Sequence, residues 1–358
     1  MKWNIGWGVI SSCNMKCEFC YSKKTRQEVQ QLSFSQWKNF IDQNCDSVNS
    51  INYGTGENTL SDDWFRLVDY IGTHYPFIRQ ALTTNGYLVK RVRENAEFDR
   101  IVKNCISEID VSLDYCIPSK HNAFRGFDSA YELAIKTLSY CETNGIISTI
   151  VFMGTNLTLE IQNISGLFDI AKAYHSKLRL NIFRPTDGIN DHSKRFIADF
   201  SKIIDALKWI NENHKIIAID DPLFASVLCD DYEQIDPSGL QSLRILPDGS
   251  ITPSTYLLKE KFRKFNILEN HVLSKIDSTN VGIEFDTPAE CAQCRYVDKC
   301  RGGVYDRRYL WYGSFNSRDP YCLYRPENYV PDFKVRISKV DSFQSIHHGY
   351  LPTMFFGV

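Results

Sequence analysis

The chain has 358 residues, 43% of them hydrophobic and 23% charged, which is ordinary for a globular protein with a full hydrophobic core. The net charge of −2 provides no basic surface for nucleic acid or an anionic membrane. No apolar run approaches the roughly 20 residues that span a bilayer, and the first residues lack the apolar core of a signal peptide. We therefore expect a cytoplasmic protein without nucleic-acid or membrane partners.

Strand-like and helix-like segments alternate over the first 215 residues. The expected strands are 3–10, 50–53, 81–84, 109–113, 146–153 and 178–183, and the expected helices are 33–43, 62–74, 130–144, 161–174 and 193–213. This order is typical of a parallel sheet with crossover helices. The sequence therefore predicts an α/β fold, a partial (β/α)6 barrel similar to a TIM barrel.

The pattern changes near residue 215. Glycine, proline, aspartate and cysteine become frequent, and residues 243–252 predict a hairpin around a Pro-Asp-Gly turn. We expect a barrel domain over residues 1–215 and a small cysteine-rich domain with a C-terminal tail over residues 216–358.

Seven of the twelve cysteines fall into two groups. A chain of this length needs no disulfides for stability, and clustered cysteines in a reducing compartment typically bind metal. The groups are Cys13, Cys17 and Cys20, and then Cys291, Cys294, Cys300 and Cys322.

The first group has the spacing C-x3-C-x2-C and follows the first predicted strand. In α/β barrels the loops at the carboxyl ends of strands carry the chemistry. Three thiolates leave one iron of a [4Fe–4S] cluster without a protein ligand, and Phe19 can shield such a cluster. The alternative is a zinc knuckle, but no histidine lies nearby to complete it.

Residues 13–21, Cys-Asn-Met-Lys-Cys-Glu-Phe-Cys-Tyr, resemble the cysteine loop of the radical S-adenosylmethionine (SAM) superfamily. The resemblance implies that SAM chelates the open iron. An electron from a donor such as flavodoxin or ferredoxin would cleave it to methionine and a 5′-deoxyadenosyl radical, which abstracts a substrate hydrogen.

Two further segments resemble family landmarks around SAM. Thr55-Gly56-Glu57 stands where the family has Gly-Gly-Glu, which implies that its backbone and Glu57 hold the SAM amino group. Thr55 departs from the family glycine. Thr84-Asn85-Gly86 ends the third strand as is common in the family, which places Asn85 beside the cofactor.

Residues 112–126 resemble the family's Ser-Leu-Asp segment with its later histidine and Arg-Gly pair. The resemblance implies that Ser112 and Asp114 lie near SAM and that Arg125 pairs with its carboxylate. No catalytic acid, base or radical donor is identifiable. Cys116 is the best candidate thiol, and an inert buried cysteine is the alternative.

The second group, C-x2-C-x5-C followed by Cys322, provides four thiolates, enough for a [4Fe–4S] cluster or a zinc ion. Its spacing resembles the SPASM extension of peptide-modifying radical SAM enzymes, which normally holds two auxiliary clusters. Only the ligands of the outer cluster match, because Ser254 and Val304 stand where the inner cluster has cysteines. We expect one auxiliary cluster, with Cys229 a buried thiol.

The resemblance implies a ribosomally synthesised peptide as substrate. Because the chain starts at the first barrel strand, we expect leader recognition by a separate protein or a substrate without a leader. The tyramine-excising spliceases fit the first layout. The alternatives are a radical SAM dehydrogenase or epimerase of a small molecule such as an aminoglycoside, and a non-catalytic zinc-binding module.

Overall fold

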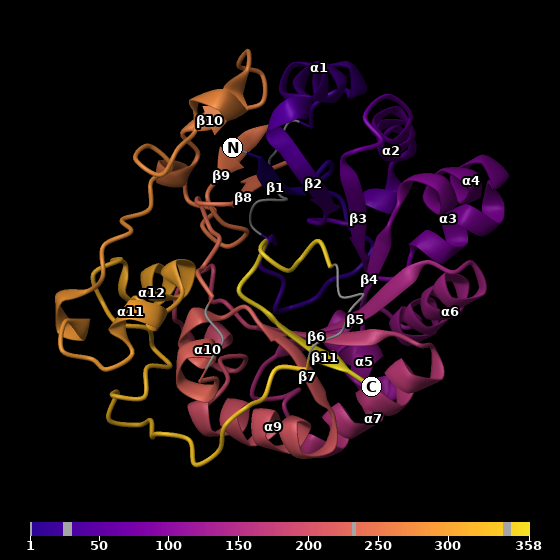
Figure 1. Ribbon diagram of the computed structural model, residues 1–358. Coiled ribbons are helices and arrows are strands. Elements are labelled where there is room, and N and C mark those ends of the chain that lie inside the picture. Colours follow the sequence, from indigo (N-terminus) through magenta and orange to yellow (C-terminus); the bar gives the residue numbers. More distant parts are fainter. Residues whose placement is uncertain (1, 24–30, 231–233, 339–344) are drawn as a thin grey trace.

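The computed structural model describes residues 2–23, 31–230, 234–338 and 345–358, and it confirms the α/β fold. Its centre is an eleven-stranded sheet in the order β10-β9-β8-β1-β2-β3-β4-β5-β6-β11-β7, curved and not closed (Figure 1). Six consecutive strands pair in parallel: β1 (Trp3–Trp7), β2 (Val48–Tyr53), β3 (Arg79–Thr84), β4 (Glu108–Ser112), β5 (Ile147–Gly154) and β6 (Lys177–Ile182).

Helices cover the outside of the curved sheet (Figure 1). The helices up to residue 213 are α1 (Phe34–Asn44), α2 (Asp62–His74), α3 (Leu88–Glu94), α4 (Ala96–Cys105), α5 (Pro118–Arg125), α6 (Ala130–Thr143), α7 (Ile161–Ala173), α8 (Asp191–Lys194) and α9 (Phe200–Asn213). Of these, α5 and α8 lie beside the loop after β1, since Phe124 stacks on Phe19 and His192 contacts the Glu18 carbonyl. The α2 face that is apolar in the sequence is buried, including Trp64, Leu67 and Ile71. Within the described ranges, no helix combines the length and apolarity that crossing a bilayer requires.

The expected helix 193–213 is wrong as a single element. The chain forms one short turn, α8, and then starts α9 only at Phe200, because residues 195–199 leave the helical path and bury Phe196 and Ala198. Helices α3, α4 and α5 were not expected.

The region after residue 215 extends the same sheet. Its elements are β7 (Lys215–Ile219), α10 (Pro222–Leu228), β8 (Ser242–Ile245), β9 (Ser250–Thr252), β10 (Phe265–Asn266), α11 (Val297–Cys300), α12 (Tyr305–Tyr312) and β11 (Met354–Gly357). Short 3-10 helices occupy Cys45–Ser47, Asn58–Leu60, Glu260–Phe262, Val272–Lys275 and Ala289–Cys291. The predicted hairpin is confirmed as antiparallel β8 and β9, and β8 joins β1 in parallel.

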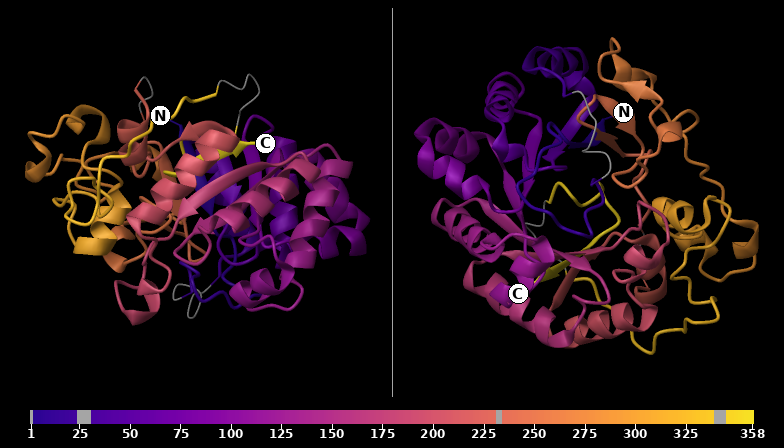
Figure 2. Two further views of the ribbon diagram at one scale, coloured as in Figure 1. Left: turned by 90° about the horizontal axis from the view of Figure 1, so that it is seen from below. Right: turned by 180° about the vertical axis from the view of Figure 1, so that it is seen from behind.

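Residues 345–351, here called the floor segment, pass inside the curved sheet (Figures 1 and 2). The Ile346 N–H donates to Glu108 at the start of β4 (2.8 Å), and Asn4 near the start of β1 donates to the Gly349 carbonyl (3.2 Å). A Cβ on Gly6 would overlap the Tyr350 hydroxyl, so glycine makes room for this side chain. The floor segment therefore lies toward the amino ends of the parallel strands.

Candidate functional site

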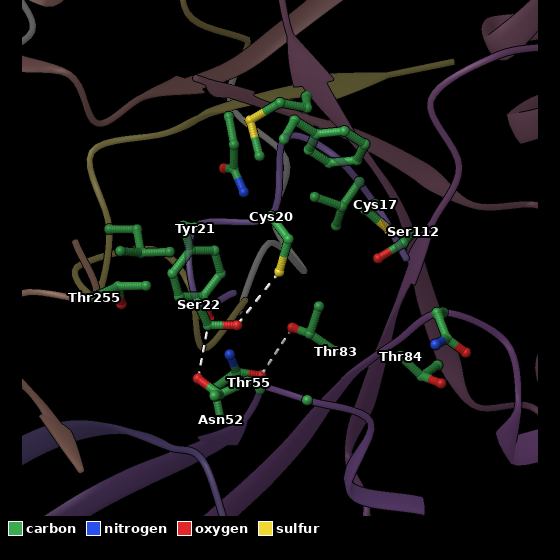
Figure 3. Close-up of a pocket in the computed structure, with 18 of the residues that line it drawn as sticks. Cys17, Cys20, Tyr21, Ser22, Asn52, Thr55, Thr83, Thr84, Ser112 and Thr255 are labelled. Carbon is green, nitrogen blue, oxygen red and sulfur yellow. Dashed lines mark hydrogen bonds between the residues drawn. The ribbon is translucent and has the colours of Figure 1, made fainter. Parts of the chain in front are cut away.

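A cavity of about 1040 Å³, part of it open to solvent, lies inside the curved sheet. The loop after β1, the carboxyl ends of β2 to β5 and the floor segment all contribute to its lining. Figure 3 shows Cys17, Cys20, Thr84 and Ser112 around this space. Most of the residues expected to bind the cluster or SAM line it: Cys13, Cys17, Phe19, Cys20, Thr55, Gly56, Asn85, Ser112, Asp114 and Arg125.

The three cysteines of the first loop lie at one end of this cavity, with a polar group beside each sulfur. Asn85 Nδ2 lies 3.6 Å from Cys13 Sγ, the Cys17 thiol donates to the Arg125 carbonyl (3.5 Å), and Cys20 Sγ is 3.4 Å from Ser22 Oγ. Burial raises the pKa of the Cys17 thiol to about 11, while the Arg125 charge lowers it. Iron binding would therefore have to displace a proton from this thiol.

The donor set fits a cluster with one open iron. Among the described residues that line the cavity, no fourth cysteine is present to complete the coordination. Phe19 covers the loop from one side: its ring stacks on Phe124 (centroids 4.2 Å apart), and the Arg125 guanidinium lies 5.1 Å from its centroid. This aromatic and cationic layer limits solvent access to the cysteines.

The loop after β2 packs directly on the cysteine loop. The Glu57 N–H donates to the Ser12 carbonyl (2.8 Å), and a Cβ on Gly56 would overlap that same oxygen. Thr55 has φ +85°, a region that glycine favours and that strains a β-branched residue. Residues 55 and 56 therefore both adopt positive φ angles, although a threonine occupies the first of these positions.

The Glu57 carboxylate is not among the groups that line the cavity. It is fully buried and accepts bonds from Thr84 Oγ1 (3.0 Å) and the Asn85 N–H (2.8 Å). Burial raises its pKa, and these hydrogen bonds act in the opposite direction. Glu57 thus fixes the loops after β2 and β3 relative to each other.

Asp114 organises the segment after β4. Its carboxylate accepts from Arg125 Nε (2.6 Å) and from the Met153 N–H (2.9 Å), and its backbone N–H donates to His121 Nδ1 (3.1 Å). Burial places the pKa of His121 well below its usual value, so the ring is neutral and can accept. Arg125 is thereby held at the cavity wall with donors beyond those used by one carboxylate.

Replacing Arg125 with alanine should weaken SAM binding about 30- to 150-fold, which corresponds to about 2–3 kcal/mol for a lost charge-assisted hydrogen bond. Anaerobic isothermal titration of the reconstituted protein with SAM measures this. The matched control is Lys120→Ala, an exposed cation of the same helix outside the cavity. Native affinity in the Arg125 variant would remove Arg125 from the SAM site.

Cys116 lies elsewhere. Its sulfur packs where a Cβ on Gly166 of α7 would be, and the residue lines a separate pocket with Lys120, Leu157 and Glu160. It is not among the residues that line the main cavity. Burial raises the pKa of this thiol. Its surroundings therefore match those of a packed cysteine outside the main cavity.

Polar residues that the sequence motifs did not predict also lie at the cavity. Arg179 of β6 pairs with Asp110 of β4 (2.7 Å), and His347 Nδ1 of the floor segment lies 2.9 Å from the same carboxylate. Arg244 of β8 also lines the cavity. The sequence did contain a pattern that could have indicated them. Asp110, Arg179 and Arg244 are charged residues between two apolar neighbours in their strands, in Ile-Asp-Val, Leu-Arg-Leu and Leu-Arg-Ile.

The second group of cysteines also converges. All four line one pocket together with apolar residues of α10: Cys291, Cys294, Cys300, Cys322, Leu223 and Val227. In the described part of the chain, no three or more His, Cys, Asp or Glu side chains are arranged to hold a single metal ion. A [4Fe–4S] cluster separates its ligands further than one ion does, because each thiolate binds a different iron. Four thiolates around one pocket are enough ligands for a [4Fe–4S] cluster or for a zinc ion.

A buried ion network holds this pocket in shape. Arg307 of α12 contacts Asp221 (2.6 Å), which caps α10, and Asp319 (2.6 Å), and all three are essentially unexposed. Asp319 also accepts from the Val304 N–H (3.0 Å). Its own N–H donates to the Gly302 carbonyl (3.0 Å), which ties the segment after Cys300 to the segment before Cys322.

The two residues that replace inner-cluster cysteines are engaged in protein contacts. Ser254 donates to Asp306 (2.6 Å), whose other oxygen accepts from Arg184 Nε (2.9 Å), and Val304 is fully buried.

Burial, followed by the nearby Asp306 charge, raises the pKa of Asp236 to about 6. Cys229 is buried, and burial raises the pKa of its thiol to about 11.

These features define an α/β protein with an open, curved sheet whose three-cysteine loop is suited to an iron–sulfur cluster with one open iron. Residues 8–165 match the family model described as "Radical SAM superfamily". The chain carries a radical SAM domain and is a radical SAM enzyme, as the cysteine loop implied. The alternative of a non-catalytic zinc module is thereby excluded.

Similar proteins come from several bacteria. The mycofactocin maturase MftC of Mycobacterium tuberculosis (strain CDC 1551 / Oshkosh) is 23% identical over 89% of this chain and 82% of its own length. The AdoMet-dependent heme synthase of Nitratidesulfovibrio vulgaris is 22% identical over 91% of this chain and 94% of its own. The crystal structure of Streptococcus suis SuiB bound to precursor peptide SuiA has a TM-score of 0.69 at 18% identity, covering 89% of this chain and 75% of that one.

Proposed function

We propose that the enzyme modifies a ribosomally synthesised peptide by abstracting a hydrogen atom from it. The observation that carries this proposal is the cavity in which Cys13, Cys17 and Cys20 face polar side chains of the barrel interior. The similarity to a maturase and to a structure holding a precursor peptide supports a peptide as substrate.

Two resident groups fit the main cavity. Cys13, Cys17 and Cys20 would hold a [4Fe–4S] cluster, and Thr55, Gly56, Asn85, Ser112 and Arg125 would surround SAM. When bound, they supply a carbon-centred radical on reduction by a donor such as flavodoxin or ferredoxin. The protein's own contribution is positioning, since Glu57 fixes the loops after β2 and β3 and Asp114 orients Arg125.

A route for the substrate lies beside the cysteine loop. Tyr21 and Tyr256 line both the main cavity and an adjacent open pocket, which Thr186, Lys259 and Arg263 also line. The two rings meet edge to face, with centroids 5.4 Å apart. An extended peptide could pass this aromatic pair to reach the cavity, while charged residues of the outer pocket contact its flanking residues.

The cysteine-rich region would hold one auxiliary [4Fe–4S] cluster on Cys291, Cys294, Cys300 and Cys322. Four thiolates saturate such a cluster, so its role would be electron transfer or ordering of the substrate site, not ligation of substrate. A reducing, cytoplasmic setting is consistent with two groups of cysteines that line pockets suited to clusters.

The experiment is a search of the neighbouring genes for a short peptide, then anaerobic co-expression with each peptide found, followed by mass spectrometry of the peptide. We expect a change in peptide mass that depends on the enzyme and is absent when Cys13, Cys17 and Cys20 are all alanine. The control is a variant with Cys45 and Cys105 replaced, two cysteines outside both cysteine pockets. An unmodified peptide in the presence of active enzyme would contradict the proposal.

The mass change also identifies the reaction subtype. Tyramine excision, as in the spliceases that work with a separate recognition protein, would remove a tyrosine-derived fragment from the peptide backbone. The second candidate is a small-molecule substrate, which the similarity to a heme synthase supports. Formation of 5′-deoxyadenosine coupled to consumption of a porphyrin or an aminoglycoside, with the peptide unchanged, would favour it.

A further inference from the structure

Arg244 on β8 lacks the carboxylate partner that the other arginines of the cavity have. Arg125 pairs with Asp114 (2.6 Å) and Arg179 with Asp110 (2.7 Å). No Asp or Glu in the described part of the chain forms an ion pair with Arg244, although this side chain is 1% exposed. Burying a cation without an anion is costly, and binding of an anionic ligand would offset that cost.

The guanidinium of Arg244 is only partly satisfied by the protein. Nη2 donates to the Gly54 carbonyl, and the Tyr350 hydroxyl is a side-chain hydrogen-bond partner. Nε is buried and has no acceptor. A planar guanidinium that lines a cavity and has no carboxylate partner is suited to bind a carboxylate.

The described residues around Arg244 provide neutral hydroxyl groups, and no acidic side chain among them competes with a ligand for the guanidinium. Tyr350 Oη lies 2.8 Å from Thr255 Oγ1, and Tyr21 Oη lies 3.1 Å from Thr55 Oγ1 (Figure 3 labels Tyr21, Thr55 and Thr255). All of these residues line the cavity, where Asp114 is the acidic residue and is already paired with Arg125. The site is therefore cationic, lined with hydroxyls and buried.

Two glycines, one in β1 and one directly after it, leave room for the Arg244 side chain. A Cβ on Gly6 would come within 2.8 Å of Arg244 Nη1, and one on Gly8 within 3.2 Å of Nη2. The residues come from β1, β8, the loop after β9 and the floor segment, which are far apart in the sequence. The fold thus gathers a candidate anion-binding surface from segments other than the one after β4 that is expected to hold SAM.

We propose that Arg244, with the hydroxyls of Tyr350 and Thr255, binds a carboxylate of the substrate. The inference rests on the proposed function for the peptide nature of that substrate, but the anion site itself does not depend on it. The carboxylate belongs to a side chain or to the C-terminus of the peptide, and its binding fixes which hydrogen faces the radical.

The test uses acetate as the probe and acetamide as its neutral isostere. Thermal unfolding of the anaerobically reconstituted holoenzyme is followed while acetate replaces chloride at constant ionic strength, with and without SAM. We expect a saturable rise of the unfolding midpoint with acetate and none with acetamide. The rise should be lost in Arg244→Gln, be reduced in Arg244→Lys and persist in Arg93→Gln, an exposed arginine outside the cavity.

Iron content and circular dichroism establish that each variant is folded and loaded. An equal acetate effect in Arg244→Gln, or no acetate-specific effect in the wild type, would overturn the site. Loss of the effect on adding SAM would show that Arg244 holds the carboxylate of SAM and would overturn the substrate assignment.

A second arm uses the peptide found by mass change, with each carboxyl converted in turn to an amide. One conversion should lower kcat/KM at least about tenfold in the wild type and have little further effect in Arg244→Gln, which corresponds to one charge-assisted bond. The two experiments test the two proposals separately. If no peptide is modified, the proposed function fails but the acetate result still supports the anion site. If acetate has no effect, the anion site fails but peptide modification is not contradicted.

Discussion

Replacing Cys13, Cys17 and Cys20 together with alanine should abolish the cleavage of SAM to 5′-deoxyadenosine under dithionite. All three side chains line one end of the main cavity, and the described lining residues include no other cysteine that could substitute. Without them the cluster that delivers the electron to SAM has no protein ligands. Chromatographic assay of 5′-deoxyadenosine after anaerobic reconstitution measures the effect.

The matched control removes Cys45 and Cys105, which line neither cysteine pocket. That variant should keep wild-type 5′-deoxyadenosine formation, which separates loss of the cluster from a general effect of fewer thiols. Unchanged 5′-deoxyadenosine production by the triple variant would mean that the cluster is bound elsewhere.

The reconstituted protein should contain about eight iron atoms per chain, on the order of four for each of two clusters. Replacement of Cys291, Cys294, Cys300 and Cys322 with alanine should lower this to about four, and so should the triple variant of the first loop. A third cluster is not expected, because Ser254 and Val304 offer no thiolate and Ser254 is hydrogen-bonded to Asp306. Iron and sulfide analysis of the three proteins provides the count.

The number of cysteine ligands of each cluster predicts how its paramagnetic signal responds to SAM. A cluster bound by four cysteines has no open iron, so SAM should perturb the paramagnetic signal of the first cluster and leave that of the second unchanged. A count near twelve iron atoms, or a cluster bound beside Cys229 and Ser254, would contradict the proposal of one auxiliary cluster.

Local patterns predicted the elements that carry their own signal. The bounds of α2 were predicted to the residue, and its apolar positions from Trp64 to Ile71 gave the helical signal. Helix α4 was missed although Asn95 caps it, accepting from the Glu97 and Phe98 N–H groups. Strand β11 has only four residues, and its pairing with β6 and β7 depends on tertiary contacts that no local pattern encodes.

Some residues of the candidate site were likewise predictable from local patterns, and others were not. The cysteine loops were predictable because ligand spacing is a local property, and both groups line single pockets. Arg179, Arg244 and Tyr350 come from three distant segments, and only folding brings them to one cavity. Glu57 shows the limit of motif reasoning: the motif located its loop, while the direction of its carboxylate depends on Thr84 and Asn85.

The position of β11 has a consequence for biosynthesis. This strand pairs with β6, made more than 170 residues earlier, and with β7, so β6 keeps an unpaired edge throughout synthesis of the intervening chain. Exposed strand edges recruit other chains, and contacts this distant in sequence slow folding. On the ribosome the sheet can be completed only after residue 357 has emerged, and the nascent chain is most exposed to aggregation until then.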